Sequence, residues 1–142
     1  MVVDASIVVR LLANRTIDET LRQRFAAPRV VHAPHLLDAE VASAVRGLLL
    51  GAKIGVPRAL EMLADFAALR ITRHPMRPYL GRIIELRNNL TAYDAFYVAL
   101  SETLRMPLLT QDLKLAERPD ITPNYRCIPD QISSRTPAWH RW

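Results

Sequence analysis

The sequence predicts an α/β fold in which a central, mostly parallel sheet has helices on both faces. Two observations support this fold class. Short apolar runs alternate with longer segments of helical periodicity from one end of the chain to the other, and prolines or glycines mark several of the expected boundaries. Parallel strands need crossover connections, which are usually helices, so this alternation is typical of a parallel sheet.

The first half of the chain predicts two strands and four helices. In the second predicted helix the acids come first and the arginines later, as the helix dipole favours, and Pro28 ends it. Gly51 closes the long helix, and Pro57 suits the first turn of the next. The expected strands are 1–3 and 29–34, and the expected helices are 5–14, 18–27, 35–51 and 57–69.

The second half continues the same alternation. Segment 92–105 shows the clearest helical periodicity, because its large apolar residues recur at i, i+3, i+4, i+7 and i+11. This stripe consists of Tyr93, Phe96, Tyr97, Leu100 and Leu104. The other expected elements are strands at 70–75, 108–111 and 125–129, and helices at 77–87 and 113–118, with a loop at 88–91.

Composition narrows the class of protein. A chain of 142 residues, half of them hydrophobic, fits one domain with a sizeable core. The single cysteine, Cys127, excludes an internal disulfide framework, and we expect a cytoplasmic protein without a signal peptide or membrane span. The net charge is +5, and the basic residues are almost all arginine. Arginine suits phosphate contacts, and a basic protein is attracted to nucleic acid. A genome that prefers arginine codons is the alternative explanation.

Four acids fall where a parallel α/β sheet binds its ligands, beyond the carboxyl ends of the strands. Asp4 and Asp112 each follow an expected strand directly. Glu40 and Asp94 lie in the early turns of helices whose starts should approach that same edge. Asp38 competes with Glu40, because helical angle places Asp38 nearer the apolar side, and periodicity alone does not choose between them.

Each acid also has a structural interpretation. Thr91 and Asp94 fit a capping box, and Asp4 and Asp112 suit N-caps of the helices that follow them. Asp38 and Glu40 would complement a helix dipole.

As a set, carboxylates crowded at one edge would repel one another, and a divalent cation would relieve the repulsion. Oxygen ligands without a His or Cys cluster favour Mg²⁺ or Mn²⁺ over zinc. Ser6 and Thr110, each two residues from an acid, could orient a carboxylate or serve only as cap hydroxyls.

The stretches "VVDASIVV", "LLDAEVASAV", "TAYDAFYVALSE" and "LLTQDLKLA", in this order and spacing, resemble the PIN-domain ribonucleases, and among them the VapC-type toxins of bacterial toxin–antitoxin pairs. The resemblance runs from residue 1 to about residue 130, so we expect a PIN-like nuclease domain over 1–130. It implies three α/β/α layers. The segment 131–142, which contains Trp139 and Trp142, is expected to be a loose or partner-binding tail.

The resemblance implies an active site that binds Mg²⁺, or Mn²⁺ in its place, through Asp4, Glu40, Asp94 and Asp112, with Ser6 and Thr110 at the hydroxyl positions. It is the family pattern that selects Glu40 over Asp38. Many relatives have a further acid shortly after the fourth, where this chain has Lys114, which leaves a second metal ion open.

The implied function is that of an endoribonuclease toxin, which hydrolyses RNA phosphodiester bonds through a metal-activated water. The implied partners are a second copy of the chain and an antitoxin that inserts an arginine and an amphipathic helix. Candidate interface helices contain 41–50 and 57–63. Four rim arginines are candidates for the RNA backbone because they are near the site acids in sequence: Arg10, Arg46, Arg87 and Arg118.

Several other classes remain as alternatives. A receiver domain needs an acidic pair after the first strand and a lysine after a later one, and this chain lacks both. A haloacid-type phosphatase needs a second aspartate where Ser6 stands. A non-catalytic RNA-binding or scaffold protein with a PIN-like fold would need no metal, and a housekeeping metal-dependent nuclease would need no antitoxin.

Overall fold

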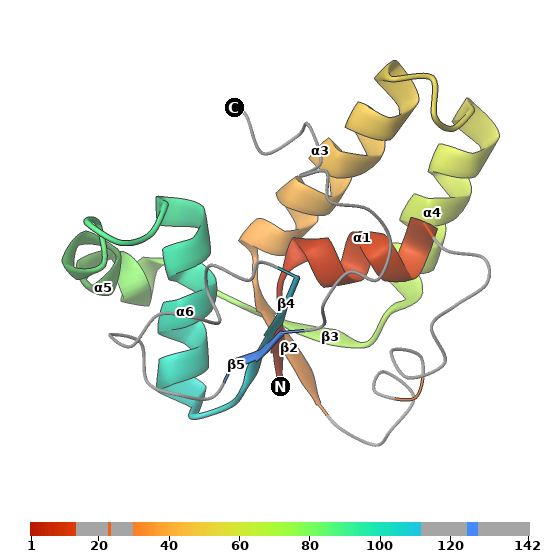
Figure 1. Ribbon diagram of the computed structural model, residues 1–142. Coiled ribbons are helices and arrows are strands. Elements are labelled where there is room, and N and C mark those ends of the chain that lie inside the picture. The colour runs from red at the N-terminus through yellow and green to blue at the C-terminus, as the bar shows by residue number, and fades with distance from the viewer. Residues whose placement is uncertain (14–22, 24–29, 112–124, 128–142) are drawn as a thin grey trace.

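The computed structural model describes residues 1–13, 23, 30–111 and 125–127, and it consists of alternating strands and helices (Figure 1). The strands are β1 (Val2–Val3), β2 (Val31–Pro34), β3 (Ile71–His74), β4 (Leu108–Thr110) and β5 (Tyr125–Cys127). The helices are α1 (Ala5–Ala13), α3 (Leu36–Leu50), α4 (Val56–Ala68), the short 3₁₀ helix η1 (Arg77–Tyr79), α5 (Leu80–Glu85) and α6 (Ala92–Leu104).

The described strands form one sheet in the order β3-β2-β1-β4-β5, and every pair in it is parallel. From the central strand β1 the chain first adds β2 and β3 on one side, and later β4 and β5 on the other. The order therefore reverses between β1 and β4. In open parallel sheets the carboxyl ends of the strands at such a reversal border a crevice that binds ligands.

Helices cover both faces of the sheet, so the predicted α/β/α arrangement is confirmed (Figure 1). Helices α1, α3 and α4 contact one another on one face, and α6 packs on β1, β2 and β4 with α5 against it on the other. The central strands β1 and β4 are thus buried on both faces. This burial explains why they consist of short apolar runs instead of alternating patterns.

Helix α6 is buried more completely than an amphipathic stripe predicts. Every residue from Ala95 to Ser101 is buried, because the sheet covers one side of the helix and α5 with η1 contacts another. The expectation that Tyr93 belongs to the buried stripe is wrong, since its exposure is 57%. Tyr93 lies in the first turn, before the buried stretch of the helix begins.

Other expected elements have slightly different bounds. The helix expected at 77–87 is divided into η1 and α5, with Pro78 in the 3₁₀ turn. The helices expected at 18–27 and 113–118 and the tail 131–142 lie outside the described residues, apart from Gln23. Among the described helices, none is long and apolar enough to cross a membrane.

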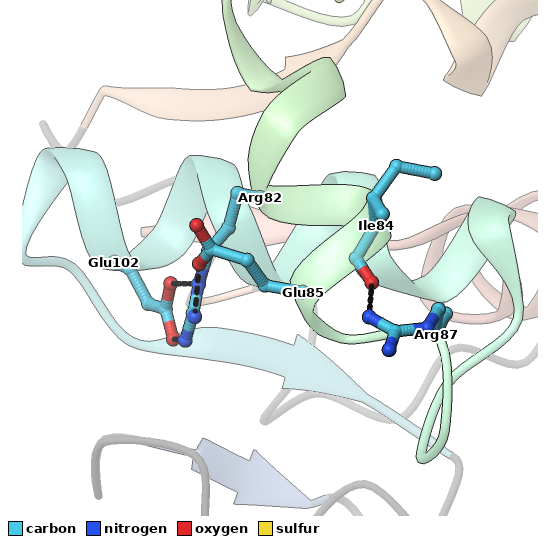
Figure 2. A network of polar contacts seen from close by, with 5 residues as sticks. All are labelled: Arg82, Ile84, Glu85, Arg87 and Glu102. Atoms are coloured by element: carbon cyan, nitrogen blue, oxygen red, sulfur yellow. Dashed lines mark hydrogen bonds and ion pairs between the residues drawn. The ribbon is translucent and has the colours of Figure 1, made fainter.

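A network of polar contacts joins α5 to α6 (Figure 2). The Arg82 guanidinium donates to both carboxylate oxygens of Glu102, at 2.9 and 3.0 Å, and its third nitrogen donates to Glu85 at 2.8 Å. Paired hydrogen bonds of this kind fix both distance and orientation between two elements. In the loop after α5, Arg87 donates to the carbonyl of Ile84.

Candidate active site

Asp4 occupies the turn between the central strand β1 and helix α1. Its Oδ1 accepts a hydrogen bond from the Ser6 hydroxyl at 2.6 Å and another from the Ile7 amide at 3.1 Å. The Thr110 hydroxyl at the end of β4 donates to the same carboxylate. Burial raises the pKa of Asp4, the charge of Asp94 adds to the increase, and the three hydrogen bonds oppose it. Asp4 is thus an N-cap and also a partly buried acid at the sheet reversal.

Glu40 approaches this position from the second turn of α3. Its Oε2 accepts a hydrogen bond from the Tyr97 hydroxyl of α6 at 2.5 Å. Burial raises the pKa of Glu40 to about 7, and the charges of Asp4 and Asp94 contribute to the rise although the Tyr97 bond opposes it. The carboxylate therefore lies in a partly dry environment with two other acids near enough to disfavour its ionisation.

Asp94 lies in the first turn of α6 and takes part in the helix cap. Its amide donates to the Thr91 hydroxyl oxygen at 3.2 Å, and that hydroxyl donates to Asp94 Oδ2 at 2.7 Å. The predicted N-cap is therefore present, and the Thr91 hydroxyl takes part in both hydrogen bonds, as acceptor in one and as donor in the other. The charge of Asp94 also raises the pKa values of Asp4 and Glu40.

The structure thus brings three of the four predicted acids, from the starts of α1, α3 and α6, into electrostatic contact. Within the described residues, no three His, Cys, Asp or Glu side chains are arranged to enclose an ion. The fourth acid, Asp112, lies outside the described residues, directly after Gln111. Because β4 is paired with β1, the described segment 30–111 ends at Gln111 beside the turn that holds Asp4.

Asp38 and Glu40, between which periodicity does not choose, differ in their contacts. The Asp38 side chain is exposed and pairs with the Arg73 guanidinium, whose nitrogens lie 2.9 and 3.1 Å from Oδ1. Arg73 also stacks on the Phe66 ring at 5.0 Å, on the outer part of the sheet. Asp38 therefore pairs with an arginine of β3, which in turn contacts α4. Glu40 instead lies near Asp4 and Asp94.

Ser6 links the ends of two strands. Its hydroxyl donates to Asp4 and accepts from the Gln111 backbone amide at 3.1 Å. When the Gln111 side-chain amide is oriented with its oxygen toward Arg10, this oxygen accepts a hydrogen bond from the Arg10 guanidinium at 2.9 Å. The amide nitrogen then donates to the Ser6 carbonyl at 3.1 Å. Arg10, a predicted rim residue, is thereby held beside Gln111.

Two residues near the acids were not predicted as site residues, namely Tyr97 and Gln111. Periodicity places Tyr97 in the apolar stripe, because it shows which side of the helix a residue occupies and not the partner of its hydroxyl. One signal was available: Tyr97 follows Asp94 at i+3, so both lie on the same side of α6. For Gln111 the contact depends on β4 pairing with β1, which no local pattern reveals.

The donor chemistry of these acids suits a hard divalent cation, although the three described acids are not by themselves arranged to enclose one. The three acids offer only carboxylate oxygens, which are the preferred ligands of Mg²⁺ and Mn²⁺. Burial is the main cause of the raised pKa values of Asp4 and Glu40, and the neighbouring carboxylates add to both rises. A bound divalent ion would favour the ionised carboxylates by supplying positive charge.

Comparison with known proteins identifies the family. The PIN domain model matches residues 1–121. The chain is 43% identical over 117 residues to VapC ribonuclease Mb0985 of Mycobacterium bovis, covering 82% of this chain and 89% of that protein. It is 40% identical over 124 residues to ribonuclease VapC1 of Mycobacterium tuberculosis, covering 84% and 91%.

Two solved structures share the fold. A toxin–antitoxin complex from Klebsiella pneumoniae superposes with a TM-score of 0.61 at 18% identity, covering 87% of this chain and 97% of the other. VapC20 of Mycobacterium tuberculosis, a sarcin-ricin loop cleaving toxin, gives 0.54 at 16% identity, covering 75% and 85%. The chain belongs to the PIN-domain family and, within it, to the VapC-type proteins.

Proposed function

We propose that this protein is an endoribonuclease of the toxin type, and that it depends on Mg²⁺ or Mn²⁺ held by Asp4, Glu40 and Asp94 together with Asp112. The observation that supports this most strongly is the convergence of Asp4, Glu40 and Asp94 at the reversal of a parallel sheet. The ribonuclease names of relatives that are 40–43% identical support the reaction type. When bound, the ion would supply the Lewis acidity that activates water and offsets phosphate charge.

The residues of the chain have distinct tasks in this proposal. Ser6 and Thr110 hold the Asp4 carboxylate in one orientation, and Thr91 does the same for Asp94. Arg10, beside Gln111, and Arg46 and Arg87, both exposed, would contact the RNA backbone. Arg118 is a further candidate outside the described residues. Single-stranded or looped RNA suits such a site, because its bases and backbone are accessible.

Asparagine variants test the proposal, because Asn has nearly the same shape, keeps one oxygen that can accept a cap hydrogen bond, and replaces the charged carboxylate by a neutral amide. We expect purified Asp4→Asn and Asp94→Asn proteins to lose Mn²⁺-dependent RNA cleavage while they keep their fold. The growth arrest caused by expression should disappear in the same variants. Cleavage by Asp94→Asn at the wild-type rate would refute the assignment of that acid, and undiminished toxicity would favour a protein that binds RNA without cutting it.

We further propose that the protein pairs with an antitoxin and forms a homodimer. The structural likeness to a toxin–antitoxin complex supports the first partner. The hairpin of α3 and α4 exposes large apolar side chains, of which Leu50, Val56 and Leu60 are 68%, 57% and 62% exposed. An antitoxin arginine could pair with the acids while an amphipathic helix covers such a surface.

Partner binding is checked by expressing the protein together with an antitoxin-sized reading frame, if one adjoins its gene, and measuring the mass of the purified complex by light scattering. We expect a complex that contains both chains and a pair of toxin subunits. A monomer that elutes alone would contradict both partner proposals.

A further inference from the structure

We propose that Tyr97 is a positioning residue of this site, whose hydroxyl holds the Glu40 carboxylate toward Asp4 and Asp94 so that Glu40 can reach the same divalent cation. This inference rests on the proposed function, because it assumes that the acids share an ion. It assigns Tyr97 no contact with the substrate. The role is to restrict the orientation of Glu40.

The geometry gives Tyr97 a firm base for this task. Its side chain is only 3% exposed, and it belongs to the continuously buried part of α6 that packs on β1, β2 and β4. Glu40 lies on α3, which begins beside α6 (Figure 1). A glutamate side chain has three rotatable bonds, so a single hydrogen bond from a rigid donor removes much of its freedom. The bond therefore fixes the orientation of the Glu40 carboxylate relative to the buried part of α6.

The choice of partner distinguishes Tyr97 from the two hydroxyls that follow it in the same helix. Ser101 and Thr103 donate to backbone carbonyls, those of Met106 and Ala99, which satisfies their hydrogen-bonding capacity locally. The Tyr97 hydroxyl instead bonds a carboxylate on another helix, 57 residues earlier in the chain. Hydrogen bonds from outer residues that orient ligand carboxylates are a general feature of metal sites.

A hydroxyl has an advantage over a basic side chain at this position. A lysine or arginine beside Glu40 would neutralise the charge that must attract a cation. The phenol orients the carboxylate and adds no positive charge. The negative charge of Asp4, Glu40 and Asp94 is thus left available for the ion.

The test is a double-mutant cycle read out by Mn²⁺ binding. Calorimetric dissociation constants would be measured for the wild type, Tyr97→Phe, Glu40→Gln and the double variant, each with its thermal unfolding midpoint. We expect Tyr97→Phe to weaken Mn²⁺ binding about tenfold, the lower end of the effect of removing an outer partner of a ligand. In the Glu40→Gln background the same change should have no further effect. Tyr79→Phe, at a half-buried tyrosine of η1, is the matched control and should bind like the wild type.

The outcomes separate this inference from the proposed function. If the wild type binds Mn²⁺ and Tyr97→Phe binds it equally well, the inference is wrong and the proposed function stands. An equal loss in the presence and absence of Glu40 also overturns it, because Tyr97 would then act by some other route. If the wild type binds no Mn²⁺, the proposed function fails and the inference fails with it.

Discussion

Asp4 and Asp94 show how one carboxylate can stabilise a helix and also belong to an acidic cluster. The Asp4 carboxylate caps α1 through the Ile7 amide, and Asp94 accepts the hydroxyl of Thr91 at the start of α6. The sequence left the structural and the functional interpretation open as alternatives. Capping does not remove either acid from the cluster, because their charges still raise the pKa of Glu40.

The first prediction compares the two neighbouring acids of α3. Glu40→Gln should reduce Mn²⁺-dependent RNA cleavage by at least about tenfold, because it removes a charged group from the cluster. Asp38→Asn should leave the rate unchanged, since Asp38 is exposed and paired with Arg73. Initial cleavage rates of the two variants at saturating Mn²⁺ check this. Equal losses in both would contradict the geometric distinction between them.

The second prediction concerns Ser6, whose hydroxyl bonds both Asp4 and the Gln111 amide. Ser6→Ala removes both contacts and should lower the free energy of unfolding by about 1 kcal/mol. RNA cleavage should also fall, because Asp4 is less firmly oriented. Urea unfolding monitored by circular dichroism measures the stability. A variant with wild-type stability and rate would show that this link is dispensable.

At the scale of elements, α5 and α6 are joined by the contacts of Arg82 with Glu102 and Glu85 (Figure 2). Glu102 lies eight residues after Asp94, about 12 Å along the helix at 1.5 Å per residue. The network therefore stabilises the helix that carries Asp94 without contacting Asp4, Glu40 or Asp94 itself.

The third prediction follows from this separation. Arg82→Ala should lower the free energy of unfolding by about 1 kcal/mol, because Arg82 is 38% exposed and solvent screens its ion pairs. Mn²⁺ affinity should stay at the wild-type value. Chemical unfolding and calorimetry measure the two quantities. A large loss of Mn²⁺ affinity would mean that the α5–α6 contacts help to set the position of Asp94.

Most described elements could be predicted from local pattern, and α6 shows where such patterns fail. Its existence and length follow from helical periodicity and the Thr91 cap. Its burial on several sides depends on contacts with the sheet, with α5 and with η1. The periodicity of segment 92–105 contains no information about these contacts. For this reason the pattern misassigned Tyr93 to the core and treated Tyr97 as an apolar residue.

At the scale of the whole molecule, the acidic cluster makes stability depend on pH. The Glu40 pKa rises from its ordinary 4.5 to about 7 on folding, so the folded state holds a proton that the unfolded chain releases. Between these values the free energy of unfolding must fall as pH rises. Above pH 7 the ionised Glu40 should lower the free energy of unfolding by about 2 kcal/mol relative to acidic pH, after allowance for its partial exposure.

The fourth prediction tests this dependence on metal-free protein in EDTA. Between pH 5 and pH 8 the wild type should lose stability relative to Glu40→Gln, which has no proton to release at this position. Other titrating groups, among them His32, are common to both proteins and cancel in the comparison. Denaturant titrations at the two pH values give the difference. A constant difference would show that Glu40 titrates normally.

The order of the strands explains why the site could be predicted only in part. The sequence alone placed Asp4 after a strand and Asp94 at a helix start, and the parallel sheet made a common edge plausible. The selection of Glu40 over Asp38 came from the family resemblance, since it depends on how α3 leaves the sheet. The contact of Glu40 with Tyr97 could not be foreseen from either helix alone, because it exists only once both are packed.

The most direct test of the central claim is a crystal structure of the protein grown with Mn²⁺, with the ion located by its anomalous scattering. We expect an anomalous peak in contact with carboxylate oxygens of Asp4 and Asp94, with Glu40 and Asp112 facing it. Absence of a peak at saturating Mn²⁺, or a peak bound only to side chains on another face, would contradict the shared metal site.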